Sequence, residues 1–183
     1  RNEVFNVSVG VGVKYVMGYY YMNAQSDNGV ITGKVAENPL FSSVSESLNL
    51  PNSNQKNSYI SPQGQGYGFD LGVTTEIYDK LKIGVSLLNV GSVKYTRNTS
   101  TIQEDTIHGL KYDNSTGDAL KKSINWTPSN SFKVNLPTTL RLGASLSLFQ
   151  KKLEIGGDII VPLNKEAGNI NKAIYAWGGD VQL

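Results

Sequence analysis

Few side chains in this sequence have catalytic or metal-binding potential. There is one histidine, His108, and no cysteine, which excludes a multi-histidine metal site, a thiolate zinc site and a cysteine nucleophile. Three acids, Glu104, Asp105 and Asp113, lie near His108, but their spacing matches no EF-hand calcium loop. We therefore predict a solvated loop here, with no metal site.

The sequence supports an enzymatic function no better than it supports a metal site. The chain has many serines and aspartates but no G-x-S-x-G elbow and no second histidine, so we predict neither an enzyme nor a bound cofactor. The segment GQGYG at 64–68 is as glycine-rich as a nucleotide loop. No Lys-Ser/Thr follows it and no helix begins there, so we expect these glycines to help a strand bend and pack.

Charged residues at strand-like positions are the remaining candidates. Eight of them fall on the polar side of alternating segments: Lys14, Asp70, Glu76, Lys82, Arg141, Glu154, Asp158 and Asp180. Such a row is typical of a lumen lining that selects permeants by charge, or of a paired network that plugs a closed lumen. We favour the network, because charges of both signs on facing strands pair readily.

These charges need long β-strands to position them. Apolar residues recur at every second position, which is the period of a strand with one apolar and one polar face. The alternation predicts strands at about 4–22, 66–78, 81–96, 132–149, 152–163 and 173–183. On their apolar side we expect lipid-facing residues: Val9, Val11, Leu71, Val85, Leu140, Leu142 and Leu146.

The connections between these strands are alternately long and short. Tight turns are predicted at Asp79-Lys80 and at Gln150-Lys151, and a break in phase predicts a β-bulge near Asn89. The long stretches 23–65 and 97–131 are rich in Asn, Ser, Gln and Gly, a composition that we expect to bury no core of its own. We predict a single segment over 1–183, without a separate second domain.

Short turns at one end and long loops at the other are typical of an outer-membrane barrel, with periplasmic turns and extracellular loops. Many aromatic residues lie near the long loops, and Phe5, Tyr78 and Phe149 lie near the short turns, as two interfacial girdles would require. Aromatic residues also simply favour strands. A formal net charge of +2 is too small for a nucleic-acid-binding protein, and we expect none as a partner.

Short motifs add a resemblance to a family. The chain resembles Bacteroidota outer-membrane barrels of unknown function, distantly similar to PorV and FadL-type barrels. The resemblance covers roughly residues 60–183 and is carried by the following positions: Gly66, Gly68, Asp70, Gly72, Asn89, Gly91, Leu136, Pro137, Thr138, Gly156, Gly157 and Asp158. It implies an antiparallel transmembrane β-barrel and transfers no functional site.

Three functions follow as expectations for this all-β chain in a Gram-negative outer membrane. The first is passive, porin-like transport of small or hydrophobic solutes. The second is a non-conducting scaffold or secretion-system partner that binds other envelope or secreted proteins through its long loops. The third is a surface β-sandwich adhesin, although strands of about 17 residues exceed the usual sandwich length.

Six strands are too few to close a bacterial barrel, so we expect part of a larger barrel or, as the alternative, closure with other chains. The two strands joined at Gln150-Lys151 predict pairs whose residue numbers sum to about 301. That register places Arg141 diagonal to Asp158, and we predict an ion pair between Arg141 and Asp158 or a neighbouring carboxylate.

Overall fold

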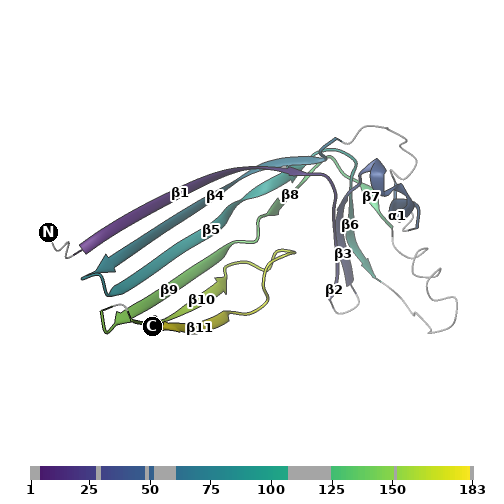
Figure 1. Ribbon diagram of the computed structural model, residues 1–183. Helices are drawn as coiled ribbons and strands as arrows, with labels where there is room; N and C mark the ends of the chain where they lie inside the picture. The colour runs from purple at the N-terminus through teal and green to yellow at the C-terminus, as the bar shows by residue number, and fades with distance from the viewer. Residues whose placement is uncertain are drawn as a thin grey trace. The chain divides into compact units, whose positions relative to one another are not determined.

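The computed structural model describes residues 5–27, 30–47, 50–51, 61–106, 125–150 and 152–181. Most of the described chain is antiparallel β-sheet, which confirms the predicted all-β class (Figure 1). It divides into two compact units, and the long strands contribute residues to both. Unit 1 comprises Arg1–Tyr15, Tyr67–Ser92 and Asn135–Leu183, and unit 2 comprises Val16–Gly66 and Val93–Val134. That the chain has no separate second domain stays a prediction.

The large sheet follows the predicted strands closely. Its order is β1 (Phe5–Gly18), β4 (Gly64–Ile77), β5 (Leu81–Tyr95), β9 (Thr139–Leu148), β10 (Leu153–Pro162) and β11 (Ile174–Val181). A short strand, β8 (Phe132–Asn135), also pairs with β5. The strand expected at 132–149 is thus two strands, because Pro137 between them has no N–H to donate to a ladder.

Tight turns lie at both predicted places, but their left-handed residues begin one position before the predicted dipeptides Asp79-Lys80 and Gln150-Lys151. Tyr78 and Asp79 have φ angles of 52°, and Phe149 and Gln150 have φ angles of 51° and 57°. Two successive left-handed residues are what a type I′ turn needs to match the twist of a hairpin. The register of β9 with β10 pairs Leu148 with Leu153, as the predicted sum of 301 requires.

The strand β5 has an irregular residue, Asn89, at the place where the break in phase predicts a β-bulge. Asn89 lies inside β5 with a φ of 59°, in the left-handed region that asparagine tolerates better than most residues. Its backbone N–H donates to the side chain of Asp70 instead of to a neighbouring strand.

Unit 2 overturns one expectation. The stretches expected to be loops without a core contain a four-stranded antiparallel sheet of β2 (Tyr21–Asp27), β3 (Val30–Ala36), β6 (Thr99–Thr106) and β7 (Thr127–Pro128). A 3-10 turn, η1 (Pro39–Phe41), and a short helix, α1 (Ser42–Ser47), follow β3. Among the described residues, the buried hydrophobic ones all lie in this unit: Ile31, Val35, Ala36, Leu50, Val93, Tyr95, Ile102 and Phe132.

An aromatic cluster fills part of this core. The ring of Tyr95 lies 5.3 Å from that of Tyr21 and 5.2 Å from that of Phe132, measured between centroids. A Cβ added to Gly64 would come within 2.7 Å of the Tyr95 ring, so the glycine makes room for it. Tyr95 and Phe132 are only 6% and 8% exposed, so for these two the girdle interpretation is wrong.

Unit 1, in contrast, is a single layer. Among its described residues only Gly68 and Ser147 are buried. Its sheet is open over the described residues, with β1 and β11 at the two ends of the strand order, and no closed barrel is formed there. No helix in the described part of the chain combines the length and the apolar character needed to cross a bilayer.

Close strand packing predicts a large effect at one glycine. A Cβ on Gly91 would collide with the backbone carbonyl oxygen of Tyr67, and no side-chain rotation relieves such a contact. We expect Gly91→Ala to destabilise the protein by about 1–3 kcal/mol or more. Gly10→Ala is the matched control, because nothing lies within 4 Å of its added Cβ. Circular dichroism melts that gave equal midpoints for the two variants would contradict this packing.

Candidate functional site

The strand register sorts the residues of unit 1 onto two faces of its sheet. Directly paired residues of antiparallel strands point to the same side. The register pairs Ser86 with Arg141, Lys82 with Ser145, Gly143 with Asp158, Ser147 with Glu154, and Glu154 with Asp180. The side chain of Asp70 lies 3.3 Å from where a Cβ of Gly12 would be, which relates β4 to β1.

All eight predicted charged residues therefore share one face, which we call the charged face. The seven residues predicted to face lipid lie on the opposite side, which we call the apolar face; for example, Val85 pairs with Leu142, and Leu146 pairs with Ile155. That the charged face lines a lumen and the apolar face contacts lipid stays a prediction.

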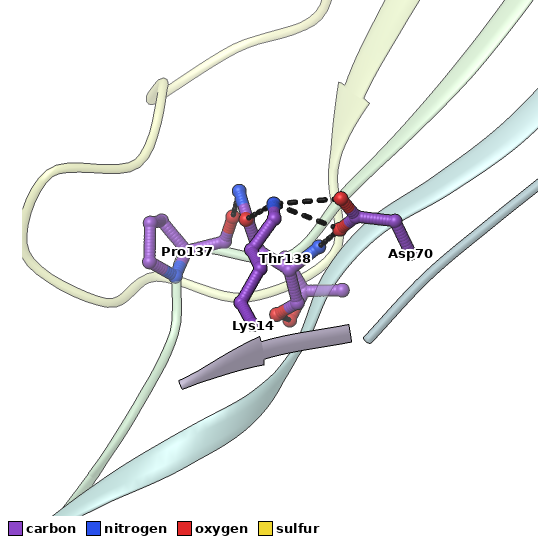
Figure 2. A network of polar contacts seen from close by, with 5 residues as sticks. Lys14, Asp70, Pro137 and Thr138 are labelled. Carbon is purple, nitrogen blue, oxygen red and sulfur yellow. Dashed lines mark hydrogen bonds and ion pairs between the residues drawn. The ribbon is translucent and has the colours of Figure 1, made fainter. Parts of the chain in front are cut away.

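The best-connected polar group on the charged face surrounds Asn89 (Figure 2). The Lys14 ammonium contacts the two carboxylate oxygens of Asp70 at 2.7 and 3.0 Å and donates to Asn89 Oδ1 at 2.7 Å. The Asn89 N–H donates to Asp70 Oδ1 at 2.8 Å, and Thr138 Oγ1 donates to the Asn89 carbonyl oxygen at 3.0 Å. The asparagine side chain also donates to the Pro137 carbonyl at 3.4 Å.

This network holds the irregular residue in place. The left-handed conformation of Asn89 removes its N–H and C=O from regular strand pairing, and Asp70 and Thr138 bind these two groups instead. The Asp70 carboxylate is in turn neutralised by Lys14. Two members of the row predicted to line a lumen are thus committed to holding the strand β5.

The network continues into the loop after β10. Asn164 Nδ2 donates to the Leu136 carbonyl at 2.7 Å and to Thr138 Oγ1 at 3.3 Å. Asn169 Nδ2 donates to the Thr138 carbonyl at 3.1 Å. The loop is therefore fastened to the segment between β8 and β9. Sequence reasoning missed these two asparagines, because an asparagine in a polar loop carries no distinguishing spacing.

A hollow of about 620 Å³ opens on the charged face over β5, β9, β10 and β11. Its charged lining residues are Lys82, Glu154, Asp158 and Asp180, and four positions on its floor are Gly84, Gly143, Gly156 and Gly178. The glycines leave the charges accessible from above. Of these four charges, Lys82 alone has an ion pair in the described chain, with Glu76 at 4.0 Å. The lining carries three acids and one base, a composition that suits small polar or cationic solutes.

The predicted ion pair of Arg141 is wrong. Arg141 pairs with Ile160 as expected, but it forms no ion pair with any carboxylate whose side chain the structure describes. The physical reason is that a glycine, Gly143, lies opposite Asp158. Asp158 pairs with Gly143, and its carboxylate lies against that residue, in the space where a Cβ would otherwise be. The Asp158 carboxylate therefore stays beside its cross-strand partner Gly143, and Arg141 remains exposed.

Unit 2 contains a buried polar cluster that the sequence did not reveal. Glu37, Asn38 and Gln63 are at most 3% exposed. Asn38 Nδ2 donates to the Tyr19 carbonyl at 3.0 Å, and the Asn98 amide donates to Gln63 Oε1 at 3.2 Å. Burial raises the pKa of the Tyr20 hydroxyl, and the negative charge of Glu37 raises it further. These contacts explain how stretches of loop-like composition hold a fixed structure.

Two further candidates from the sequence are the acidic residues around His108 and the GQGYG segment. The side chains around His108 lie outside the described residues, and among the side chains that are described no group of three or more could hold a metal ion. The GQGYG segment belongs to β4 and forms no loop. A Cβ on its Gly68 would lie 2.7 Å from the Leu136 side chain, so that glycine serves packing, as predicted.

Comparison with known protein families gives one match. Residues 2–166 match a family described as a family of unknown function, DUF5723. The chain belongs to this family. No curated protein and no solved structure matches it. For this DUF5723 protein, the likeness to PorV and FadL-type barrels and to Bacteroidota proteins therefore stays a prediction, and its function has to be argued from its own geometry.

The two ion pairs found among the described residues of this DUF5723 chain allow a matched comparison. Lys14 and Asp70 form several charge-assisted contacts, but their side chains are 44% and 23% exposed, so we expect a coupling free energy of about 0.5–1 kcal/mol. The Lys82–Glu76 pair is similarly exposed but joined only at 4.0 Å, and its coupling should be smaller. Double-mutant cycles with Lys→Met and acid→amide substitutions measure both. A larger coupling for Lys82–Glu76 would contradict the geometry.

Proposed function

We propose that this chain is part of an outer-membrane β-barrel that passes small or hydrophobic solutes. The observation that carries the proposal is the apolar face of unit 1. Large hydrophobic side chains on that face are exposed from β1 to β11, and they are Phe5, Val7, Val9, Val11, Val13, Tyr15, Tyr67, Phe69, Leu71, Val73, Ile83, Val85, Leu142, Ile155, Tyr175, Trp177 and Val181.

An apolar face of this extent has to be shielded from water. Contiguous apolar patches on soluble monomers rarely exceed a few hundred Å². The apolar face carries no charged residue on the described strands of unit 1, since the eight charges lie on the other side. A lysine or arginine facing lipid at the bilayer midplane would cost roughly 2–4 kcal/mol. The distribution of charge therefore favours lipid as the cover.

Strand length supports the same conclusion. A tilted strand crosses the hydrocarbon layer with about 9–11 residues. β1 and β4 have 14 residues each, β5 has 15, and β9 and β10 have 10 each. These strands are long enough to cross, whereas the usual strand of a soluble protein has about 5–6 residues. The adhesin alternative requires protein to cover the apolar face, and the large hydrophobic side chains of that face are exposed.

Transport is favoured by the hollow on the charged face, which keeps Glu154, Asp158, Asp180 and Lys82 open to solvent instead of sealing them in a dense network.

A specific observation also supports the scaffold function. The segment after β3 in unit 2 exposes Leu40 (60%), Phe41 (44%) and Val44 (40%) beside one another in sequence, as a protein-binding turn would.

Adjacent residues of β9 test the membrane assignment. We expect Arg141→Cys to react with a water-soluble maleimide in intact membranes and Leu142→Cys to be protected, because the two side chains lie on opposite faces. The cross-strand partners Ser86→Cys and Val85→Cys repeat the comparison on β5. In urea-unfolded protein all four cysteines should react alike. Ready labelling of Leu142→Cys in membranes would contradict the proposal.

Arg141 also separates a channel from a scaffold. If the chain lines a conducting pore, removing this exposed cation leaves the lining more acidic, so Arg141→Ala should shift the reversal potential in planar bilayers toward cation selectivity. A scaffold should show no conductance with either protein, and its melting midpoint should change little, since Arg141 has no ion pair in the described chain.

A further inference from the structure

A second hollow, of about 520 Å³, lies on the apolar face near the turns of the large sheet. Its large lining side chains are Leu81, Leu146, Ile155 and Trp177. Small residues create the space between them. Gly179 pairs with Ile155, and Ala144 lines the hollow on β9. The volume falls within the roughly 300–1,000 Å³ of small-molecule sites, and the lining is almost wholly apolar.

Exposed aromatic and cationic residues border this end of the sheet. The β4–β5 turn exposes Tyr78 (64%) and then Lys80, and the β9–β10 turn exposes Phe149 (74%) and then Lys152. The Ser147 N–H donates to the Lys80 carbonyl oxygen at 2.7 Å, so the two turns are held at the same edge. Asp79 is the one acid described within these turns.

The two hairpins thus repeat one arrangement. In each, the first left-handed turn residue is aromatic, and a lysine follows before the next strand begins. Aromatic rings favour the boundary between lipid tails and headgroups, and lysines near that boundary attract anionic headgroups. The apolar hollow begins beside these turns, at Leu81, which directly follows Lys80.

We propose that this end of the sheet binds an anionic phospholipid, with an acyl chain in the hollow between Leu146 and Trp177 and the phosphate at Lys80 and Lys152. The proposal rests on the proposed membrane function and adds a preferred lipid to it. Charge complementarity selects the occupant. A neutral lipid would gain nothing from the lysines, and an extended peptide would find few hydrogen-bonding side chains in the hollow.

Trp177 is a built-in reporter, because it lines the hollow and is 91% exposed. In the full chain, Trp126→Phe leaves Trp177 as the sole tryptophan. This protein is reconstituted into phosphatidylcholine vesicles that contain a minor fraction of either phosphatidylglycerol or phosphatidylcholine with brominated acyl chains. We expect brominated phosphatidylglycerol to quench Trp177 more strongly at equal mole fraction, with an enrichment of about fivefold per lysine.

Charge variants identify the source of the preference. Lys80→Gln/Lys152→Gln should make the two lipids quench equally, and high salt should weaken the preference by screening. The control Lys165→Gln/Lys172→Gln removes the same charge from two exposed lysines in the loop between β10 and β11, at the other end of those strands. That variant should keep the preference for phosphatidylglycerol.

A filled hollow tests the acyl-chain site. Ala144→Leu should reduce quenching by phosphatidylglycerol while leaving the weaker quenching by phosphatidylcholine in place. Equal quenching of the parent protein by both lipids would overturn the lipid site and leave the membrane function standing. Absence of quenching by either lipid would overturn the membrane function as well.

Discussion

The structure of unit 1 depends on the covering of one face of a single-layer sheet. A sheet with one apolar side is stable only when that side is removed from water. Covering each large hydrophobic side chain contributes about 1.5–3 kcal/mol, and more than a dozen lie on this face. Unit 1 supplies no cover of its own among its described residues, of which only Gly68 and Ser147 are buried. The stability of unit 1 therefore depends on what shields its apolar face from water.

The irregular residue Asn89 shows how a polar network serves architecture before it serves transport. A left-handed residue in a long strand leaves its N–H and C=O without ladder partners, and in a lipid environment such groups must be satisfied internally. Asp70 and Thr138 supply the partners, and Lys14 balances the carboxylate. The charges of β1 and β4 near this point are therefore explained without a permeant, and the acids of β10 and β11 are the ones that line an open hollow.

Period-two alternation was sufficient to predict the strands of the large sheet, its turns and the register of β9 with β10. These features follow from local pattern and turn chemistry. The second sheet could not be predicted in this way, because β2 and β3 have only seven residues each and their core is partly polar. Buried polar side chains stabilise it through hydrogen bonds between residues far apart in the sequence, such as Asn38 with the Tyr19 carbonyl and Asn98 with Gln63, and such contacts leave no periodic signal. The predicted ion pair of Arg141 is wrong for a related reason. The alternation places Arg141 on the correct face, but the glycine opposite Asp158 decides where the carboxylate lies.

Glycine positions thus carry information that charge patterns alone do not. On the charged face, Gly143, Gly156 and Gly178 open the hollow in which the unpaired acids of β10 and β11 stay accessible. On the apolar face, Gly179 and Ala144 open the smaller hollow beside the lysine-bearing turns. Side chains of ordinary size at these places would give a sheet with two smooth faces, one polar and one oily. Because small residues leave space on both faces of β10 and β11, the solute site and the lipid site that we propose lie back to back on the same two strands.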